Sequence, residues 1–152
     1  MTQRVDLATV MDRLAIDELI TSYAVAVDDS DWHAYRALFA REGRADYRSS
    51  GGIEGPAAEV ADWMAEAMRL FPVRQHLIVN RRLHIQDLGG YPGDRAEVQA
   101  DYVNPMRLES GDDFVSGGRY TFGLLRTDAG WRLHTVVIHE KWRRAPEALG
   151  GA

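Results

Sequence analysis

The stretch FVSGGRYTFGLLRTDAGWRLHTVVIHEKW, residues 114–142, decides the fold of this chain. It predicts two long β-strands, Phe114 to Arg126 and Trp131 to Trp142, because aromatic and β-branched residues recur in both segments. The residues between them, Asp128-Ala129-Gly130, are typical of a tight turn. A turn this short joins antiparallel neighbours, so the two segments should pair as a hairpin.

Two further strands are expected before this hairpin. Residues 73–86 alternate in polarity, and the apolar side of this strand should carry Val73, Leu77, Val79, Leu83 and Ile85. The opposite side is polar except for one isoleucine, and it carries Arg74, His76, Ile78, Asn80, Arg82 and His84. A turn at residues 89–94 leads to a strand from Ala96 to Leu108, and a break at residues 109–113 leads to the hairpin. The short connections predict an antiparallel meander.

The start of the chain has the spacing of an α-helix. From Ile16 to Val27 the apolar residues fall on one face, which consists of Ile16, Leu19, Ile20, Tyr23 and Val27. A different face carries Leu7, Val10, Met11 and Leu14. Either this helix is buried on two sides, or the residues before it form a separate segment.

Two shorter helices should follow. The first runs from Trp32 to Phe39, with Asp31 or Ser30 as its N-cap. The second begins at residues 55–56, where a proline suits the first helical position, and it ends at Pro72. Its inner face should consist of Val60, Trp63, Met64, Ala67 and Phe71. A short strand, residues 44–48, lies between the two helices.

These elements predict an α+β fold, a cone-shaped α+β barrel in which a curved antiparallel sheet carries the helices on its concave face. Helices placed there leave a conical cavity, which is a natural site for a small molecule. We expect a single domain over residues 1–145 and a flexible C-terminal tail over residues 146–152, which is rich in glycine and alanine.

Composition excludes several classes of function. The 152 residues carry a formal net charge of −5, which argues against a nucleic-acid partner. The chain has no cysteine, so thiolate catalysis is excluded, and its five histidines lack the spacing of metal ligands on a helix. The histidine spacing therefore gives no reason to expect a metal. No nucleotide-binding motif is present either, so no other cofactor is expected. Without an apolar run of roughly 20 residues or a leader-like start, we expect a cytoplasmic protein with no membrane contact.

Asp28 and His76 are the two strongest candidates for chemistry. Asp28 ends the first predicted helix, where the negative end of the helix dipole disfavours a carboxylate, so a nearby partner is expected. The simpler interpretation is that Asp28 and Asp29 are solvated beside the capping residue of the next helix. His76 lies early in a strand on its polar side, where a half-exposed structural histidine is the simpler interpretation.

Several short segments together point to a known family. They are Ser22-Tyr23, Val27-Asp28-Asp29-Ser30-Asp31-Trp32, Ala45-Asp46-Tyr47-Arg48-Ser49, Arg74-Gln75-His76-Leu77-Ile78, Gly118-Arg119-Tyr120 and Gly130-Trp131-Arg132-Leu133. Through them the chain resembles the SnoaL-like family of the nuclear transport factor 2-like superfamily, from about Leu14 to Trp142. The nearest members in motif are scytalone dehydratase, bile-acid 7-alpha-dehydratase and the lindane dehydrochlorinase.

The resemblance implies a role for four residues. Asp28 and His76 match the carboxylate and the strand histidine that these lyases pair. Tyr23 matches an active-site tyrosine of the bile-acid enzyme, and Tyr47 matches a substrate-facing tyrosine of the scytalone enzyme. Two positions depart from the scytalone pattern, because Val27 stands where that enzyme has a tyrosine and Met106 where it has a second histidine. These departures put scytalone-type substrate recognition in doubt.

The resulting hypothesis is a cofactor-free lyase or isomerase, dehydratase-like, that acts on a mid-sized alicyclic or aromatic hydroxy-carbonyl compound. His76 would remove a proton as general base, Asp28 would orient it, and Tyr23 or Tyr47 would stabilise the enolate. Candidates for the substrate-binding wall are Trp32, Phe39, Met64, Phe71, Tyr102, Met106 and Tyr120.

Two other functions remain open at this point. One is a non-catalytic binding or assembly module, as in the small subunits of ring-hydroxylating dioxygenases. The other is an epoxide hydrolase, for which Asp46, Asp101 and Arg119 could supply polar groups. We also expect a homo-oligomer, a trimer or a dimer, because the final strand, with Val136, Ile138 and Trp142, has apolar residues on both sides.

Overall fold

The computed structural model describes residues 6–86 and 90–147. In chain order its main elements are α1 (Leu7–Asp28), α2 (Trp32–Ala37), β1 (Phe39–Asp46), β2 (Glu54–Pro56), α3 (Ala57–Ala67), β3 (Val73–Arg74), β4 (Leu77–Ile85), β5 (Arg95–Arg107), β6 (Asp113–Thr127) and β7 (Gly130–Arg144). Two 3₁₀ turns, η1 (Arg48–Ser50) and η2 (Met68–Leu70), follow β1 and α3. Part of the expected tail, residues 148–152, lies outside the described residues.

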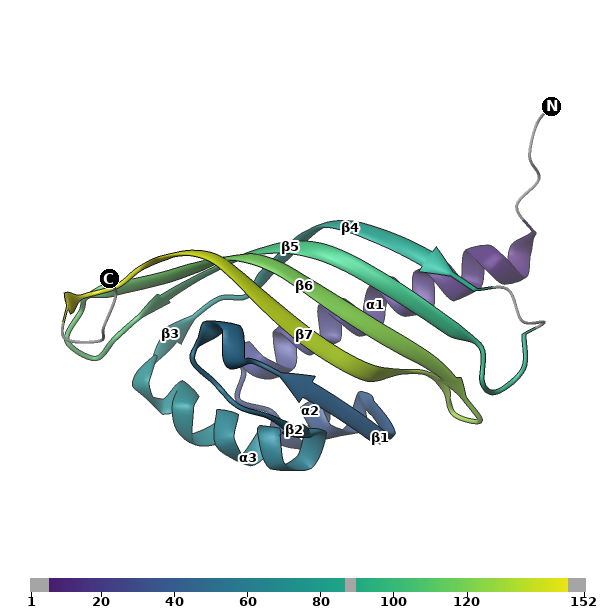
Figure 1. Cartoon of the computed structure of the whole chain (residues 1–152), viewed down its shortest axis with the longest axis horizontal. Helices are drawn as coiled ribbons and strands as arrows, with labels where there is room; N and C mark the ends of the chain where they lie inside the picture. Colours follow the sequence, from purple (N-terminus) through teal and green to yellow (C-terminus); the bar gives the residue numbers. More distant parts are fainter. Residues whose placement is uncertain (1–5, 87–89, 148–152) are drawn as a thin grey trace.

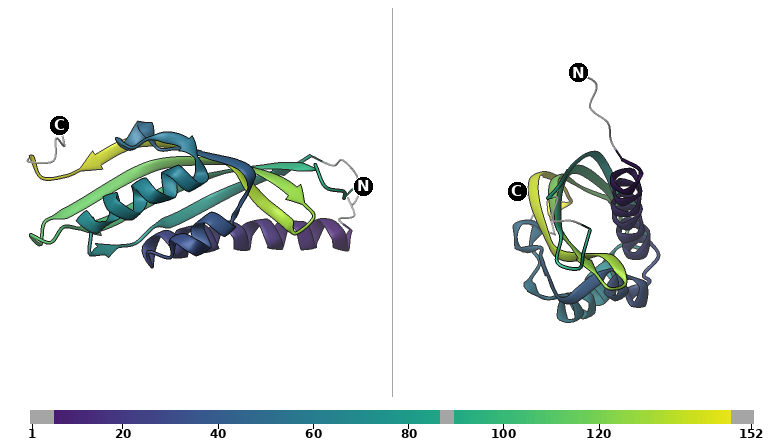
Figure 2. Two further views of the ribbon diagram at one scale, coloured as in Figure 1. Left: turned by 90° about the horizontal axis from the view of Figure 1, so that it is seen from below. Right: turned by 90° about the vertical axis from the view of Figure 1, so that its right-hand side faces the viewer.

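One curved sheet of seven strands forms the body of the molecule. Its order is β2-β1-β7-β6-β5-β3, and β4 also pairs with β5. The long strands β5, β6 and β7 twist together, and α1, α2 and α3 lie on the concave side of the sheet (Figures 1 and 2). The core lies between these layers, where Tyr23 and Val27 of α1 meet Phe122 of β6 and Leu133 of β7. The predicted α+β class and helix placement are therefore confirmed.

The sheet is not wholly antiparallel. The predicted meander is present as β4, β5, β6 and β7, but β1 pairs with β7 in parallel, with Ala45 opposite Val136. This contact joins segments some 90 residues apart, and a local pattern of polarity carries no information about it. The strand predicted at residues 44–48 begins earlier, at Phe39, and ends at Asp46.

The first helix is longer than its buried stripe. α1 is continuous from Leu7, where Asp6 accepts a hydrogen bond from the backbone N–H of Thr9 as N-cap. Neither of the two expected arrangements of its start is correct, because the first half belongs to the same helix and its apolar side chains are exposed. The exposed set is Leu7, Val10, Met11 and Leu14.

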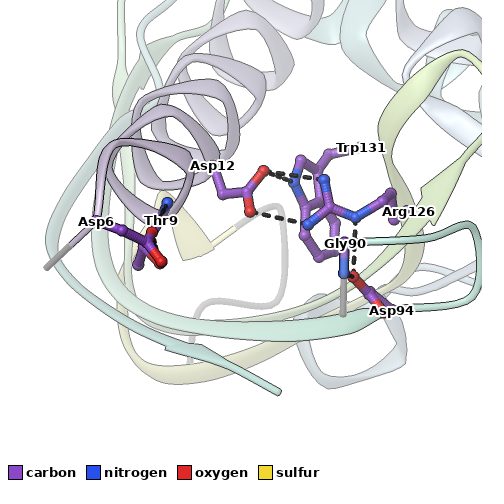
Figure 3. A network of polar contacts seen from close by, with 7 residues as sticks. All are labelled: Asp6, Thr9, Asp12, Gly90, Asp94, Arg126 and Trp131. Carbon is purple, nitrogen blue, oxygen red and sulfur yellow. Dashed lines mark hydrogen bonds and ion pairs between the residues drawn. The ribbon is translucent and has the colours of Figure 1, made fainter. Parts of the chain in front are cut away.

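A polar network attaches that first half to the sheet (Figure 3). Arg126 donates two hydrogen bonds to the carboxylate of Asp12, at 2.9 and 2.8 Å, and a third to Asp94 at 3.0 Å. The indole N–H of Trp131 also donates to Asp12, at 3.1 Å, and the Arg126 guanidinium lies over the Trp131 ring. The network ties α1 to the β6–β7 hairpin at the end opposite the cavity described below.

The predicted strand at residues 73–86 is interrupted twice. It breaks at residues 75–76 into β3 and β4, and a bulge follows at Asn80, whose backbone has φ 51°. The pairing of Val79 with Asp101 and of Arg82 with Gln99 leaves one extra residue in β4. The five residues expected on the apolar side of this strand therefore do not all face the same way. The bulge reverses which side chains of β4 face inward, so the residues before it and those after it point to opposite sides of the sheet. Val73, Leu77 and Val79 face outward, whereas Ile78, Leu83 and Ile85 pack on the core.

The two short helices also end differently from expectation. α2 stops at Ala37, and Phe39 opens β1 instead of closing the helix. Its N-cap is Asp31, which accepts from the backbone N–H of Ala34 at 3.0 Å, as one of the two expected caps. Pro56 is the last residue of β2 and precedes α3, because its extended backbone pairs with Arg44 of β1. α3 ends at Ala67 and not at Pro72, because the chain tightens there into η2, and Phe71 therefore follows the helix instead of belonging to its inner face.

Candidate active site

Asp28 and His76 meet at the C-terminal end of α1. The Nδ1 atom of His76 lies 2.6 Å from Oδ1 of Asp28. The backbone N–H of His76 also donates to this carboxylate, at 2.9 and 3.0 Å to its two oxygens. Because Asp28 accepts from Nδ1–H, the lone pair of the neutral imidazole is on Nε2. The carboxylate therefore selects the tautomer that a general base requires.

The break between β3 and β4 makes this contact possible. His76 is placed in the interruption, so its N–H is free of the ladder and points to Asp28, while the preceding Gln75 N–H donates to Pro105 on β5. The side chains of both partners are largely shielded from water, with 6% of His76 and 20% of Asp28 exposed. In such surroundings a charge-assisted hydrogen bond is stronger than on an open surface.

Arg74 explains how α1 tolerates a carboxylate at its C-terminus. Its guanidinium donates to the carbonyl of Val27 at 3.1 Å and to the carbonyls of Met68 and Phe71 at 3.0 and 2.9 Å. A cation at this end of a helix offsets the negative end of the dipole. The partner that the position of Asp28 called for is therefore His76, and Arg74 supports the same corner of the fold.

His76 lies on the wall of a cavity of about 200 Å³ beneath α3 and η2. Most of the wall is apolar, formed by Trp63, Met64, Ala67, Met68, Leu70, Phe71, Met106, Phe114 and Ile138. The polar groups on it come from Tyr47, Ser50, His76, Asn104, Ser116, Tyr120, Glu140 and Arg143. An apolar chamber with a few polar groups is the usual form of a small-molecule site.

Three tyrosine hydroxyls meet beside this cavity. The hydroxyl of Tyr47 lies 2.5 Å from that of Tyr23 and 2.9 Å from that of Tyr35. Tyr47 is on the cavity wall, whereas Tyr23 and Tyr35 are fully buried behind it. If both buried hydroxyls donate to Tyr47, its own proton is free to point into the cavity.

Burial keeps these tyrosines protonated. It raises the pKa of Tyr23 and of Tyr47 well above the ordinary value, and the neighbouring tyrosines add to the effect. Burial also raises the pKa of Tyr35 and of Tyr120. Near neutral pH all four are neutral hydroxyls, so the two that line the cavity, Tyr47 and Tyr120, bring no charge to its wall.

The structure brings some of the expected site residues together and separates others. Asp28 and His76 are in contact, and Met64, Phe71, Met106 and Tyr120 join Tyr47 on the wall. Three residues expected on that wall are placed elsewhere. Trp32 and Phe39 pack around Tyr35, and Tyr102 is buried with its hydroxyl 3.2 Å from Ser116. All three rings pack in or against the core. Trp32 and Phe39 do so because α2 and the start of β1 lie against Tyr35 and not over the cavity.

The polar residues considered for an epoxide hydrolase do not gather in this cavity. Asp46 forms an ion pair with Arg48, and Asp101 forms one with Arg119 on the half-exposed side of the sheet. Within residues 6–86 and 90–147, no group of three or more histidine, aspartate or glutamate side chains is arranged to hold a metal ion. None of the described helices is long and apolar enough to cross a membrane.

Several residues in and around this site were not among the expected site residues, and three of them, Tyr35, Asn104 and Ser116, are polar groups next to the expected ones. Tyr35 follows Trp32 by three positions, and that spacing on a short helix could have indicated an inward-facing ring. Asn104 and Ser116 lie on strands whose alternation places them inward, but a polar residue at such a position gives no sign of a cavity. Their proximity to His76 depends on the pairing of β5 with its neighbours.

The fold and the site define a class of protein, a cone-shaped α+β domain with a histidine–carboxylate pair on the wall of a mainly apolar cavity. The chain belongs to the SnoaL-like domain family, whose model matches residues 8–137. An uncharacterized protein of Mycobacterium tuberculosis is 30% identical over 129 residues, which cover 83% of each chain. The resemblance stated from the sequence is thereby confirmed.

Solved structures show the same fold. A candidate aromatic ring hydroxylase from Novosphingobium aromaticivorans superimposes with a TM-score of 0.78 at 25% identity, covering 91% of this chain and 96% of that one. A candidate scytalone dehydratase from the same organism gives 0.74 at 15% identity, over 89% and 87% of the two chains. A hexachlorocyclohexane dehydrochlorinase from Novosphingobium barchaimii gives 0.77 at 16% identity, over 92% and 93%. The structural neighbours thus include proteins named as dehydratases and dehydrochlorinases.

Proposed function

We propose that this protein is a cofactor-free lyase or isomerase that removes a proton from a carbon next to a carbonyl group. The observation that carries this proposal is the contact of His76 Nδ1 with Asp28 on the wall of a mainly apolar cavity. The contact leaves the Nε2 lone pair to act as general base, and Asp28 stabilises the imidazolium that forms. General base catalysis of this kind contributes roughly 10²–10⁴ in rate.

Tyr47 is the group proposed to stabilise the product of proton removal. When the α-carbon loses its proton, negative charge moves to the carbonyl oxygen, and a neutral hydroxyl on the cavity wall can donate to it. Tyr23 and Tyr35 act through Tyr47, because their hydroxyls reach it and not the cavity. Tyr23, which the family resemblance suggested for the site, is therefore a positioning residue in this proposal.

The size and lining of the cavity define the class of substrate. About 200 Å³ is below the usual range for large ligands, roughly 300–1,000 Å³, and suits a compound with one ring better than one with four fused rings. Aromatic and methionine side chains on the wall favour an alicyclic or aromatic body. A hydroxy-carbonyl compound of this size supports either return of the proton to another carbon or loss of water.

Exchange of α-hydrogens with solvent deuterium tests the proposal. Single-ring ketones are incubated with the protein in D₂O, and incorporation is followed by NMR. The wild-type protein should catalyse incorporation, and His76→Ala should reduce it by roughly 10²–10⁴. Equal incorporation by wild type and His76→Ala would exclude His76 as the base. The second candidate function, a non-catalytic binding or assembly module, predicts ketone binding without any exchange; the likeness to the candidate ring hydroxylase favours testing it.

A further inference from the structure

A second hollow lies beside the cavity, between η1 and the last residues of β7. β1 pairs with β7 as far as Val137, which is opposite Asp46, and the chain then turns into η1. Beyond Val137 the edge of β7 is flanked by η1, where Ser49 accepts a hydrogen bond from the backbone N–H of Glu140 at 2.9 Å. A groove of about 520 Å³ remains at this edge, lined by residues 48–51 and 140–143.

This groove adjoins the candidate active site. Four residues line both the groove and the cavity, namely Ser50, Gly51, Glu140 and Arg143. Gly51 is exposed, and a Cβ atom at its position would have no atom of the surrounding residues within 4 Å, so the space around it is open. Its φ of 91° favours glycine, so no side chain separates the two hollows at this point. The cavity therefore approaches the surface at the groove.

The groove is rich in cations, although the chain as a whole carries a net charge of −5. Its wall contains Arg48, Lys141 and Arg143, but Glu140 as the one acidic residue. Glu140 accepts a hydrogen bond from Arg143 at 2.8 Å, and Arg48 forms an ion pair with Asp46. Lys141 is exposed and has no ion-pair partner within residues 6–86 and 90–147. Its ammonium group, which carries three donors and no acceptor, is therefore open to an anion.

We propose that the groove binds an anionic group, a carboxylate or a phosphate, on a short tail of a substrate whose ring occupies the cavity. This inference rests on the proposed function, because it takes the cavity as the substrate site. Ile138 on the cavity wall precedes Lys141 on the groove wall by three residues, which is roughly 10 Å along a strand. A short alkyl chain spans this distance together with the length of the lysine side chain.

The two hollows then divide the recognition of the substrate. Burying an anion among the apolar side chains of the cavity would be costly, whereas the groove offers cations in contact with water. The ring, in contrast, gains from leaving water for the apolar cavity. The cations also attract an anion before it binds, which favours entry through this side. The substrate that fits both hollows is a single-ring ketone with an acid at the end of its tail.

Ketones with the same ring and differently charged tails test this assignment. The probes are 4-(4-oxocyclohexyl)butanoate, its uncharged carboxamide, and 3-(4-oxocyclohexyl)propyl phosphate. Binding is followed through the fluorescence of the tryptophans, of which Trp63 lines the cavity. Wild type should bind at least one of the acids roughly 3- to 30-fold more tightly than the carboxamide, and the acid that binds more tightly identifies the anionic group. The preference should shrink in about 0.5 M NaCl, because salt screens exposed charges.

Variants at exposed cations locate the preference. Lys141→Gln should remove most of it and leave the affinity for the carboxamide unchanged, whereas Lys141→Arg should keep it. Arg107→Gln is the control, because Arg107 is an exposed cation on β5 that pairs with Asp113 and lies outside the groove. It removes the same charge from the same sheet and should retain the preference.

The outcomes separate this inference from the function beneath it. If wild type binds the acids and the carboxamide equally, the role of the groove is overturned and His76 remains the proposed base. The same conclusion follows if Lys141→Gln keeps the full preference, or if Arg107→Gln loses as much of it. A preference that depends on Lys141, without α-deuterium exchange in any of the ketones, would overturn the proposed function and leave the groove as a binding site.

Discussion

Asp28 accepts hydrogen bonds from both the backbone N–H and the imidazole Nδ1 of His76. One carboxylate therefore fixes the main chain and the ring of the same residue. The rotation of the imidazole and its tautomer are set before any substrate enters, so less ordering is required at the moment of reaction. The contact also joins the end of α1 to the sheet across 48 residues of sequence.

Asp28→Asn should abolish most of the activity without unfolding the protein. The carboxamide keeps the shape of the side chain, but it no longer stabilises the imidazolium and can present a donor to Nδ1, which favours the wrong tautomer. We expect the rate of α-deuterium exchange to fall roughly 10²–10⁴-fold. Asp29→Asn, the same change at the adjacent exposed residue, is the control and should leave the rate within about twofold. Similar losses in both variants would contradict the orienting role.

Tyr47→Phe should slow the reaction more than Tyr23→Phe or Tyr35→Phe. Tyr47 is the one of these three tyrosines that lines the cavity, and in the proposed mechanism its loss removes a donor to the enolate oxygen, which is worth roughly 10²–10³ in rate. The two buried hydroxyls act only by orienting Tyr47, so their loss should cost less. Steady-state kinetics of the three variants on one substrate measures this order. A larger loss in Tyr23→Phe would make Tyr23 the donor instead.

The attachment of α1 to the β6–β7 hairpin should weaken in acid. Hydrogen bonds from Arg126 hold the pKa of Asp12 below its ordinary value of 3.8, and Trp131 adds to the effect. The stabilisation is therefore complete above about pH 5 and is lost as the pH falls through the lower, folded-state pKa. Urea unfolding between pH 7 and pH 2.5 should show Asp12→Asn less stable than wild type at pH 7, by about 1–3 kcal/mol, with the difference shrinking in acid.

Asp17→Asn serves as the control for this measurement. Asp17 is on the same helix and pairs with Arg81, but its side chain is 62% exposed. Exposed ion pairs contribute about 0–1 kcal/mol, so this variant should unfold nearly as wild type does. A constant difference between wild type and Asp12→Asn across the pH range would contradict the electrostatic origin of the attachment.

We expect the protein to form a homo-oligomer through the convex face of the sheet. Leu77, Val103 and Trp142 are exposed in one row across β4 to β7, and the Trp142 ring lies against Gly117 between them. Val136 and Ile138, on which the sequence-based expectation also relied, are buried in the core and offer nothing to a partner. Light scattering at micromolar concentration should give a dimer or a trimer, and Val103→Glu should shift it toward monomer. A wild-type monomer would contradict the expectation.

Much of the fold followed from the sequence because its periodic patterns are local. The alternation and short turns after residue 90 predicted β5, β6 and β7 to within a residue or two at each end. The stripe from Ile16 to Val27 predicted the buried half of α1. The position of Asp28 at a helix C-terminus, where the dipole disfavours it, indicated a partner before the partner was known.

Only the tertiary structure decided the rest, because it depends on contacts between distant segments. The bulge at Asn80 reverses which side chains of β4 face the core, and no local pattern in the sequence predicts this bulge. The pairing of β3, β4 and β5 places Asn104 beside His76, and the course of α2 brings Tyr35 to Tyr47. By itself the sequence determined which segments are helices and strands. It also identified Asp28 and His76 as a carboxylate and an imidazole that could act together. The long-range pairing, which no short stretch of residues encodes, decided which side chains share the cavity.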